Sequence, residues 1–205
     1  MVPLGIVVST VGSRSLAVLK ASVKEYGEGV PIFVHYGDRG NFGDDYNAAI
    51  SRAFGFYGCR EVIVANDDVV LDPDTVPTLL EDVARVRVRN PRVGFVAARS
   101  NFVRSVQNIN SNPGSTVVMA PAISPVFAWL SREAFDTAQF PPINWYSDDV
   151  MCADLIRAGF VHYVSRAYVH HAGSLTIGRD AAQLTADAMP WLQANRPQYV
   201  REWFR

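Results

Sequence analysis

Short apolar runs alternate with longer mixed stretches through the first hundred residues of the chain. Three short apolar runs, 3–9, 31–36 and 61–65, predict strands; of these, 3–9 is expected to be buried and 61–65 to be buried on both faces. The stretches between them carry apolar residues at helical spacing and predict helices over about 15–26 and 44–54. Strands that alternate with helices in this way are typical of a largely parallel, doubly wound sheet. We therefore expect an α/β fold.

The second half of the chain is less regular. Residues 102–121 are polar and rich in turn formers, which predicts a long surface loop. One or two amphipathic helices, broken near Pro190 and Pro197, are expected over 177–205. The other expected elements are a helix over 75–87, strands over 93–97 and 123–131, a short helix over 132–137, a helix that ends at Gly159, and a strand over 160–169.

Composition narrows the class of protein only slightly. The 205 residues are 49% hydrophobic and 19% charged, and the net charge of −1 gives no general attraction to nucleic acid or to an anionic membrane. Cys59 and Cys152 lie far apart, so neither a disulfide framework nor a zinc site is indicated. The chain lacks a basic start typical of a signal peptide, and no apolar run approaches the roughly 20 residues of a membrane span. We expect a cytoplasmic protein without membrane contact.

Three oxygen-bearing side chains directly follow the predicted strand 61–65: Asn66, Asp67 and Asp68. Ligands of open α/β sheets bind beyond the carboxyl ends of the strands. Two adjacent carboxylates repel each other, and a divalent cation relieves that repulsion; oxygen ligands suit Mg²⁺ or Mn²⁺ better than zinc. The motif indicates a metal–diphosphate site, with a solvated turn as the alternative for so short a sequence.

A second pair of acids, Asp148 and Asp149, opens a predicted helix beside two aromatic residues. Acids at a helix N-terminus complement the helix dipole and cap free amides, which explains one of the two acids more readily than both. Further along, His170 follows the predicted strand 160–169. Its imidazole is either a metal ligand or an ordinary hydrogen-bonding group.

Six arginines lie within twenty residues of one another. A solvated helix end followed by a loop is the ordinary explanation for such a run. A phosphate-binding face, for a donor or for a nucleic-acid acceptor, is the alternative. The six are Arg85, Arg87, Arg89, Arg92, Arg99 and Arg104.

Taken in order, these motifs resemble the nucleotide-sugar-dependent glycosyltransferases of the GT-A fold, particularly the large inverting family that includes cellulose-synthase-like and rhamnosyltransferase-like enzymes. The resemblance covers residues 4–203. It rests on Ser9-Thr10, Gly37-Asp38, the helix that carries Asn47, Asn66-Asp67-Asp68, Asp148-Asp149 and His170-His171-Ala172-Gly173-Ser174.

The fold that the resemblance implies is a GT-A-type (Rossmann-like) α/β domain with a mixed, mostly parallel sheet flanked by helices. One domain would span 1–205. Its first part, 1–100, would be the nucleotide-binding half, and 101–205 the acceptor and catalytic half with a helical tail.

The resemblance also implies a role for each matching residue. Asp149 would be the general base, and Asp68 would bind a divalent cation, Mn²⁺ or Mg²⁺, that bridges the two phosphates of the donor. His170 would be a second metal ligand, with the adjacent His171 as the alternative. Residues that would contact the nucleotide or donor are Ser9, Thr10, Arg14, Asp38, Asn47, Asn66 and Asp67, with Asp38 against the base.

The implied reaction is transfer of a sugar from a nucleotide-diphosphate sugar, most commonly a uridine diphosphate sugar in this family, to an acceptor hydroxyl with inversion. The acceptor is open: a glycan, a protein or a modified DNA base would each fit. Two alternatives remain. A nucleotidyltransferase of similar fold usually has a glycine-rich loop with lysine after the first strand, whereas 9–14 has one glycine and no lysine. A non-catalytic nucleotide-sugar-binding module would keep the scaffold without the reaction.

Overall fold

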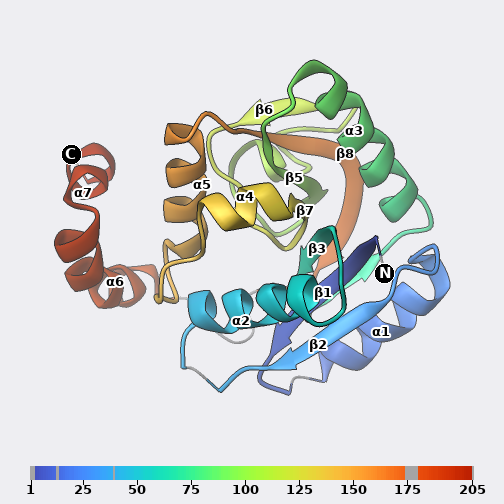
Figure 1. Ribbon diagram of the computed structural model, residues 1–205, viewed down its shortest axis with the longest axis horizontal. Coiled ribbons are helices and arrows are strands. Elements are labelled where there is room, and N and C mark those ends of the chain that lie inside the picture. Colours follow the sequence, from blue (N-terminus) through green and yellow to red (C-terminus); the bar gives the residue numbers. More distant parts are fainter. Residues whose placement is uncertain (1–2, 13, 39, 174–179, 205) are drawn as a thin grey trace.

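A computed structural model describes residues 3–12, 14–38, 40–173 and 180–204 of the chain (Figure 1). Its strands form one eight-stranded sheet. They are β1 (Leu4–Thr10), β2 (Ile32–Tyr36), β3 (Glu61–Ala65), β4 (Val69–Leu71), β5 (Val93–Ser100), β6 (Val118–Ala120), β7 (Phe127–Ser131) and β8 (Val161–His171). The helices are α1 (Ser15–Tyr26), α2 (Phe42–Gly55), α3 (Thr75–Arg89), the 3₁₀ turn η1 (Ser105–Gln107), α4 (Arg132–Thr137), α5 (Ser147–Arg157), α6 (Ala181–Asn195) and α7 (Pro197–Trp203).

The strand order is β2-β1-β3-β7-β5-β8-β4, and β6, which lies outside this order, pairs with β8. The pairs β1–β2, β1–β3 and β5–β8 are parallel. Strand β7 runs antiparallel between β3 and β5, so β2, β1, β3, β5 and β8 all point the same way. The predicted α/β fold with a mixed, mostly parallel sheet is confirmed.

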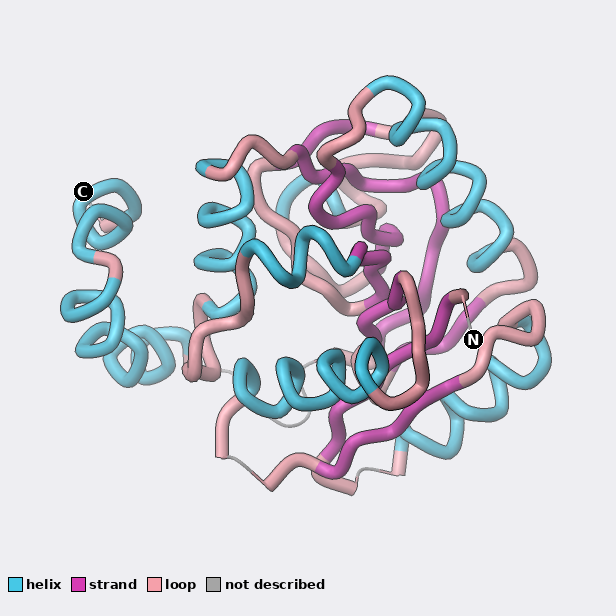
Figure 2. The backbone as a smooth tube through the Cα atoms, viewed as in Figure 1, coloured by secondary structure: helices cyan, strands magenta, loops and turns pink. Residues whose placement is uncertain are grey.

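Helices cover both faces of this sheet (Figure 2). On one face α1 and α3 belong to the same apolar cluster as Ile63 and Ala65 of β3, and on the other α2, α4 and α5 share a cluster with Val62 and Val64. Because neighbouring residues of a strand point to opposite faces, a strand covered on both sides must be apolar throughout. This accounts for the unbroken apolar runs that predicted β1 and β3.

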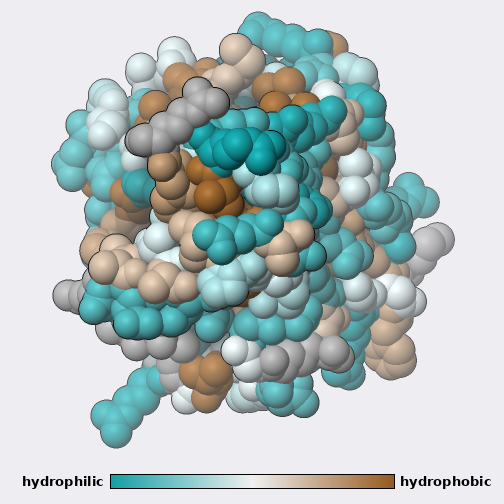
Figure 3. Space-filling view, turned by 90° about the vertical axis from the view of Figure 1, so that its left-hand side faces the viewer, coloured by the Kyte–Doolittle hydropathy of each residue, from teal (hydrophilic) through white to brown (hydrophobic). Residues whose placement is uncertain are grey.

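The helices α6 and α7 lie at one end of the molecule, where they pack against the start of α5 (Figure 1). Tyr199 of α7 is fully buried there and donates from its hydroxyl to Asp154 at 2.6 Å. On this side, hydrophobic side chains form separate small areas among hydrophilic ones (Figure 3). None of the helices in the described residues combines the length and apolar character that a bilayer crossing requires.

Three features of the sheet differ from the prediction. Strand β4 follows Asp68 where no strand was predicted, and β6 lies within the predicted loop 102–121. Both strands have only three residues and pair with β8, which is distant from them in the sequence. The local pattern of apolar residues does not reveal such pairings. Strand β8 also continues past residue 169 to His171, because β4 pairs with its last three residues.

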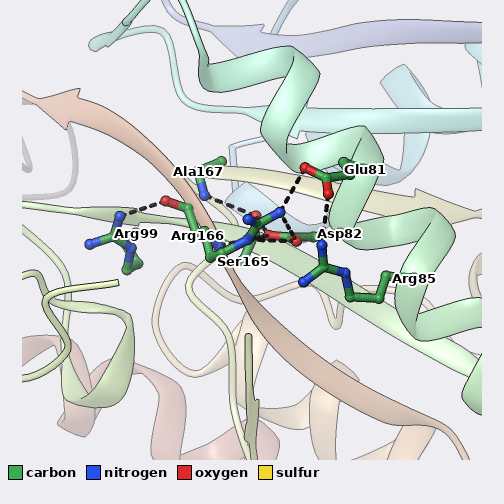
Figure 4. Close-up of polar contacts among 7 residues, drawn as sticks. All are labelled: Glu81, Asp82, Arg85, Arg99, Ser165, Arg166 and Ala167. Atoms are coloured by element: carbon green, nitrogen blue, oxygen red, sulfur yellow. Dashed lines mark hydrogen bonds and ion pairs between the residues drawn. The ribbon is translucent and has the colours of Figure 1, made fainter. Parts of the chain in front are cut away.

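A buried carboxylate fastens α3 to the middle of β8, where the register between β5 and β8 shifts (Figure 4). Asp82 is fully buried and accepts hydrogen bonds from the Ser165 hydroxyl and the Arg166 backbone N–H, both at 2.8 Å. The Arg166 guanidinium lies 2.7 Å from the Asp82 carboxylate and 2.8 Å from that of Glu81. Burial opposes the ionisation of Asp82, but these hydrogen bonds hold its pKa below the usual value. Asp82 therefore accepts hydrogen bonds from β8 at the point where the pairing between β5 and β8 is interrupted.

We expect Asp82→Asn to lower the free energy of unfolding by about 3 kcal/mol, because the Arg166 charge would lose its buried partner. Since the pKa of Asp82 is lowered in the folded state, its contribution is present above the unfolded value of about 4 and is lost as the pH falls below it. Urea denaturation at pH 7 and below pH 4 measures both effects. The exposed pair Arg85–Glu81 supplies the control: Arg85→Gln should change stability by less than about 0.5 kcal/mol. Equal losses in the two variants would contradict the assignment.

Candidate active site

Two pockets adjoin at the carboxyl ends of β1, β3 and β8. The first pocket has a volume of about 380 Å³ and the second about 480 Å³. Both are lined by Phe42, Asn66, Asn144 and His171, which form the wall between them. The Asn144 side chain accepts from the Phe42 backbone N–H at 2.8 Å and so joins the start of α2 to the segment before α5. A molecule in one pocket thus has a direct neighbour in the other.

The first pocket contains the acids that follow β3. Asp67 and Asp68 are both buried and line it. Asp67 accepts from the Thr10 hydroxyl at 2.5 Å, which ties the ends of β1 and β3 together. Asp68 Oδ1 lies 3.0 Å from His171 Nε2. Strand β4 explains this contact, because its pairing with β8 sets Val69 opposite His171.

His171 is held in one orientation by the segment after β5. Its Nδ1 donates to the Phe102 carbonyl at 2.7 Å, and its backbone N–H donates to Asn101 Oδ1 at 2.7 Å. Burial opposes protonation, but the hydrogen bond and charge of Asp68 hold the pKa of His171 above its ordinary value. A metal-binding histidine usually donates one ring N–H to a backbone carbonyl or a carboxylate, which leaves the other nitrogen for the metal. Here Nδ1 makes such a bond to Phe102, and Nε2 lies beside the Asp68 carboxylate.

The predicted metal ligand His170 is not part of this arrangement. It is exposed and pairs with Val70, whereas its neighbour His171 is buried and faces Asp68. Successive strand residues point to opposite faces, so only one of the two histidines can reach the pocket. His171, the alternative to His170, is therefore the histidine that lies in the pocket beside Asp68. The resemblance pointed to His170 without fixing the register of the strand that carries both.

Asp68 and His171 supply an oxygen and a nitrogen on adjacent chain segments, with Asn66 Nδ2 3.4 Å from His171 Nε2. The Asp68 carboxylate, together with oxygens from a ligand, is the kind of donor that Mn²⁺ or Mg²⁺ prefers, whereas an imidazole ligand such as His171 also suits other divalent metals. Within the described residues, a second group with metal-ligand character comprises His35, Asp38 and Asp45, whose ligand atoms lie within 4.8 Å of one another. Asp38 is exposed, and its backbone N–H donates to Asp45 at 3.2 Å.

The structure brings together four of the seven residues predicted to contact the nucleotide. Ser9, Thr10, Asn66 and Asp67 line the first pocket. The other three lie outside both linings. Arg14 and Asp38 are exposed, and Asn47 uses its amide to bond the backbone N–H and carbonyl of Phe140, at 3.1 and 2.7 Å. Asn47 is thus satisfied by a contact that braces α2 against the chain before α5.

Sequence reasoning missed Asp45 and Tyr46, which also line the first pocket. Tyr46 is buried, and its hydroxyl donates to the Ala65 carbonyl at 2.9 Å; burial raises its pKa. Asp45 is 8% exposed. Asp45 lies next to the apolar positions of a predicted helix, and this position was the available indication that its side chain is buried.

The second pocket contains the acid pair at the start of α5. Asp148 and Asp149 share one guanidinium: Arg104 Nη2 lies 2.6 Å from Asp149 Oδ2 and 3.4 Å from Asp148 Oδ2. Asp148 Oδ1 also accepts from the Asp149 backbone N–H at 3.1 Å. Burial, and then the charge of Asp149, raise the pKa of Asp148 to about 6, although Arg104 opposes the rise. Four aromatic rings line the same pocket: Phe42, Phe102, Trp145 and Tyr146.

The six arginines between residues 85 and 104 do not form one phosphate-binding face. Arg104 belongs to the second pocket, and Arg99 donates to the carbonyls of Asn112 and Arg166. Arg89 is exposed. The remaining three pair with separate acids: Arg85 with Glu81, Arg87 with Glu61 and Arg92 with Glu133.

No family model matches the sequence, and no curated protein matches it. Solved structures share its fold. A197 from STIV is 11% identical, with a TM-score of 0.56 over 80% of this chain and 81% of that chain. S. aureus TarS 1–349 is 13% identical, with a TM-score of 0.56 over 97% of this chain and 74% of that chain. At identities this low, the similarity concerns the fold alone.

Proposed function

We propose that the protein is a metal-dependent glycosyltransferase that moves a sugar from a nucleotide-diphosphate sugar to an acceptor hydroxyl, with inversion at the anomeric carbon. One observation carries the proposal. The buried Asp68 carboxylate in the first pocket and a carboxylate pair in the second are separated by a wall of four shared residues, one of which is His171, the partner of Asp68. A donor in the first pocket and an acceptor in the second would meet at that wall.

The first pocket would take the nucleoside diphosphate. Asp68 and His171 would hold Mn²⁺ or Mg²⁺, and the bound cation would offset the negative charge that the leaving diphosphate acquires. The hydroxyls of Ser9 and Thr10 and the amide of Asn66 line the pocket as hydrogen-bonding groups for the nucleotide. The fold places them all at strand carboxyl ends, where ligands of open α/β sheets bind.

The second pocket would take the acceptor, with Asp149 as general base. As the acceptor oxygen bonds to the anomeric carbon, the bond from that carbon to the diphosphate breaks and Asp149 takes the hydroxyl proton. A single in-line displacement inverts the anomeric centre, and no second protein carboxylate is needed to protonate the leaving group. Asp148 is less suited to the role of base, because one of its oxygens already caps the backbone N–H of Asp149.

A panel of uridine, guanosine and thymidine diphosphate sugars tests the proposal. In the presence of Mn²⁺ and a mixture of glycan acceptors, we expect one donor to release its nucleoside diphosphate. Chelation with EDTA should lower the rate at least about tenfold, because the leaving group would lose its counter-charge. Chromatography of the nucleotide products measures both rates.

Parallel assays with nucleoside triphosphates plus sugar phosphates, and melting curves with the nucleotide sugars, separate the alternatives. A nucleotidyltransferase would instead release pyrophosphate from a nucleoside triphosphate and a sugar phosphate. A non-catalytic binding module would raise its melting temperature with a nucleotide sugar but release nothing. Either outcome would contradict the transferase proposal.

A further inference from the structure

Arg104 makes a contact that the proposed reaction does not by itself require. Its guanidinium is half-exposed, yet it binds both carboxylates at the start of α5. The contact to Asp149 is the shorter, at 2.6 Å, and uses Oδ2. Within the described part of the chain, Asp149 Oδ1 has no hydrogen-bond partner. Arg104 thus holds Oδ2, while no hydrogen bond from the described residues engages Oδ1.

The loop that carries Arg104 is braced on both sides. Gln107 is buried and donates to the carbonyls of Ala98 and Ser124 at 3.0 and 2.8 Å, and it accepts from the Ser124 backbone N–H at 3.0 Å. Asn108 donates to the Val103 carbonyl at 2.8 Å. These bonds fix the backbone before and after Arg104. The Arg104 side chain therefore extends from a rigid segment of backbone.

Two residues next to this contact have a left-handed backbone, which non-glycine residues rarely adopt. Ser105, directly after Arg104, has a φ of 60°, and Tyr146, which precedes α5, has a φ of 66°. The Tyr146 ring lies against Trp203 and Phe204, with centroid distances of 6.1 and 5.4 Å. Backbone strain persists only where the surrounding structure enforces it, and it is concentrated at functional sites. Both partners of the ion pair are therefore presented by constrained backbone.

We infer that Arg104 is a positioning residue for the transfer: it binds Oδ2 of Asp149 and leaves Oδ1 for the acceptor hydroxyl. The inference rests on the proposed function, because it assigns to Arg104 the orientation of the base proposed there. Arg104 need not touch the substrate. Its effect on the rate follows from geometry, since a reacting group that is displaced by about 1 Å can lose about 10²-fold in rate.

Arg104 also offsets the mutual repulsion of the two acids. The ionisable groups that face the pair are Arg104 from the loop after β5, Cys152 from the next turn of α5, and Tyr146 and His171 from the pocket wall. Of these, Arg104 carries the charge that opposes the rise in the pKa of Asp148. Its removal would leave two partly buried carboxylates side by side, and one of them would then hold a proton at a higher pH.

Three variants test the inference: Arg104→Gln, Arg104→Lys and the control Arg92→Gln. Arg92 has the same side-chain exposure as Arg104, 49%, and pairs with Glu133 on the surface. For Arg104→Gln we expect kcat to fall about 10- to 100-fold, with the donor KM unchanged. The Asp148 carboxyl resonance, followed by NMR, should titrate about one pH unit higher than in the wild type. Arg104→Lys should restore the Asp148 titration but only part of kcat, because an ammonium keeps the charge and lacks the planar fork.

The two readouts separate this inference from the proposed function. If the wild type turns over and Arg104→Gln matches it in kcat and in the Asp148 titration, the role of Arg104 is overturned. If Arg92→Gln loses as much activity as Arg104→Gln, a general structural effect replaces the positioning role. If the wild type does not turn over any donor, the proposed function is overturned, and the NMR titration still decides whether Arg104 governs the ionisation of the acid pair.

Discussion

The Asp149→Asn variant is expected to bind the donor with nearly unchanged affinity and to turn it over about 10²–10⁴-fold more slowly than the wild type. The amide keeps the size of the side chain but cannot take the proton of the acceptor hydroxyl. Donor affinity should survive because Asp149 lines the second pocket, whereas the diphosphate would occupy the first. Isothermal titration with the donor and steady-state kinetics with the acceptor measure the two quantities.

Asp136→Asn is the matched control for this prediction. Asp136 is an exposed acid on α4 and lines neither pocket. Its replacement should leave both donor affinity and kcat within about twofold of the wild type. A parallel loss of donor affinity and turnover in Asp149→Asn would remove Asp149 from the role of base, because a base acts in the transition state and not in donor binding.

Asp68→Asn is expected to abolish the effect of Mn²⁺ on donor binding and to lower turnover with it. Asp68 is the carboxylate that faces His171, and without its charge the imidazole would be the remaining strong ligand of the pair. Loss of outer groups around a metal site costs about 10–100-fold in affinity, so loss of a direct ligand should cost at least as much. Calorimetric donor titrations with and without Mn²⁺ measure the effect, and a melting curve checks that the buried substitution leaves the variant folded.

The control for Asp68 is Asp38→Ala, in the second group with metal-ligand character. His35, Asp38 and Asp45 lie close enough together to hold an ion by themselves. If Asp38→Ala removes the Mn²⁺ dependence and Asp68→Asn retains it, the cation binds at that group and the assignment of Asp68 is wrong. We expect Asp38→Ala to keep the dependence, because Asp38 is exposed and lies outside the first pocket.

The parts of the fold that were predictable from the sequence are those encoded by local patterns. The apolar run of β3 ends at Ala65 and is followed directly by Asn66, Asp67 and Asp68. Consecutive residues therefore predicted both the strand and the oxygen-bearing side chains at its carboxyl end. The start of α5 was similarly marked by Asp148 and Asp149. In each case the elements and their polar ends are neighbours in the sequence.

Features that depend on long-range pairing could not be read in this way. The identity of the pocket histidine depends on the three residue pairs between β4 and β8, about a hundred residues apart in the chain. A shift of one residue reverses which side chain faces the pocket, so the family motif that pointed to His170 could not decide between it and His171. Asp149, the partner of Arg104, lies 45 residues away in the sequence. The sequence therefore did not distinguish Arg104 from the five other arginines of the run.

Asn47 shows the opposite error. Asn47, on the predicted helix 44–54, matched the expected motif. Its amide instead donates to the carbonyl and accepts from the N–H of Phe140, 93 residues further along. Buried amides bond to the nearest unsatisfied backbone groups, and those belong to whichever segment packs against the helix. A motif match therefore identifies a residue in the sequence but does not establish that its side chain lies in the site.

An anomalous difference map from crystals grown with Mn²⁺ and a nucleoside diphosphate tests most directly whether Asp68 and His171 hold a cation in the pocket next to the one that contains Asp149. We predict one peak in contact with the Asp68 carboxylate and the His171 imidazole, with the diphosphate beside it at the shared wall. A peak at His35, Asp38 and Asp45 with none at Asp68 would contradict the account.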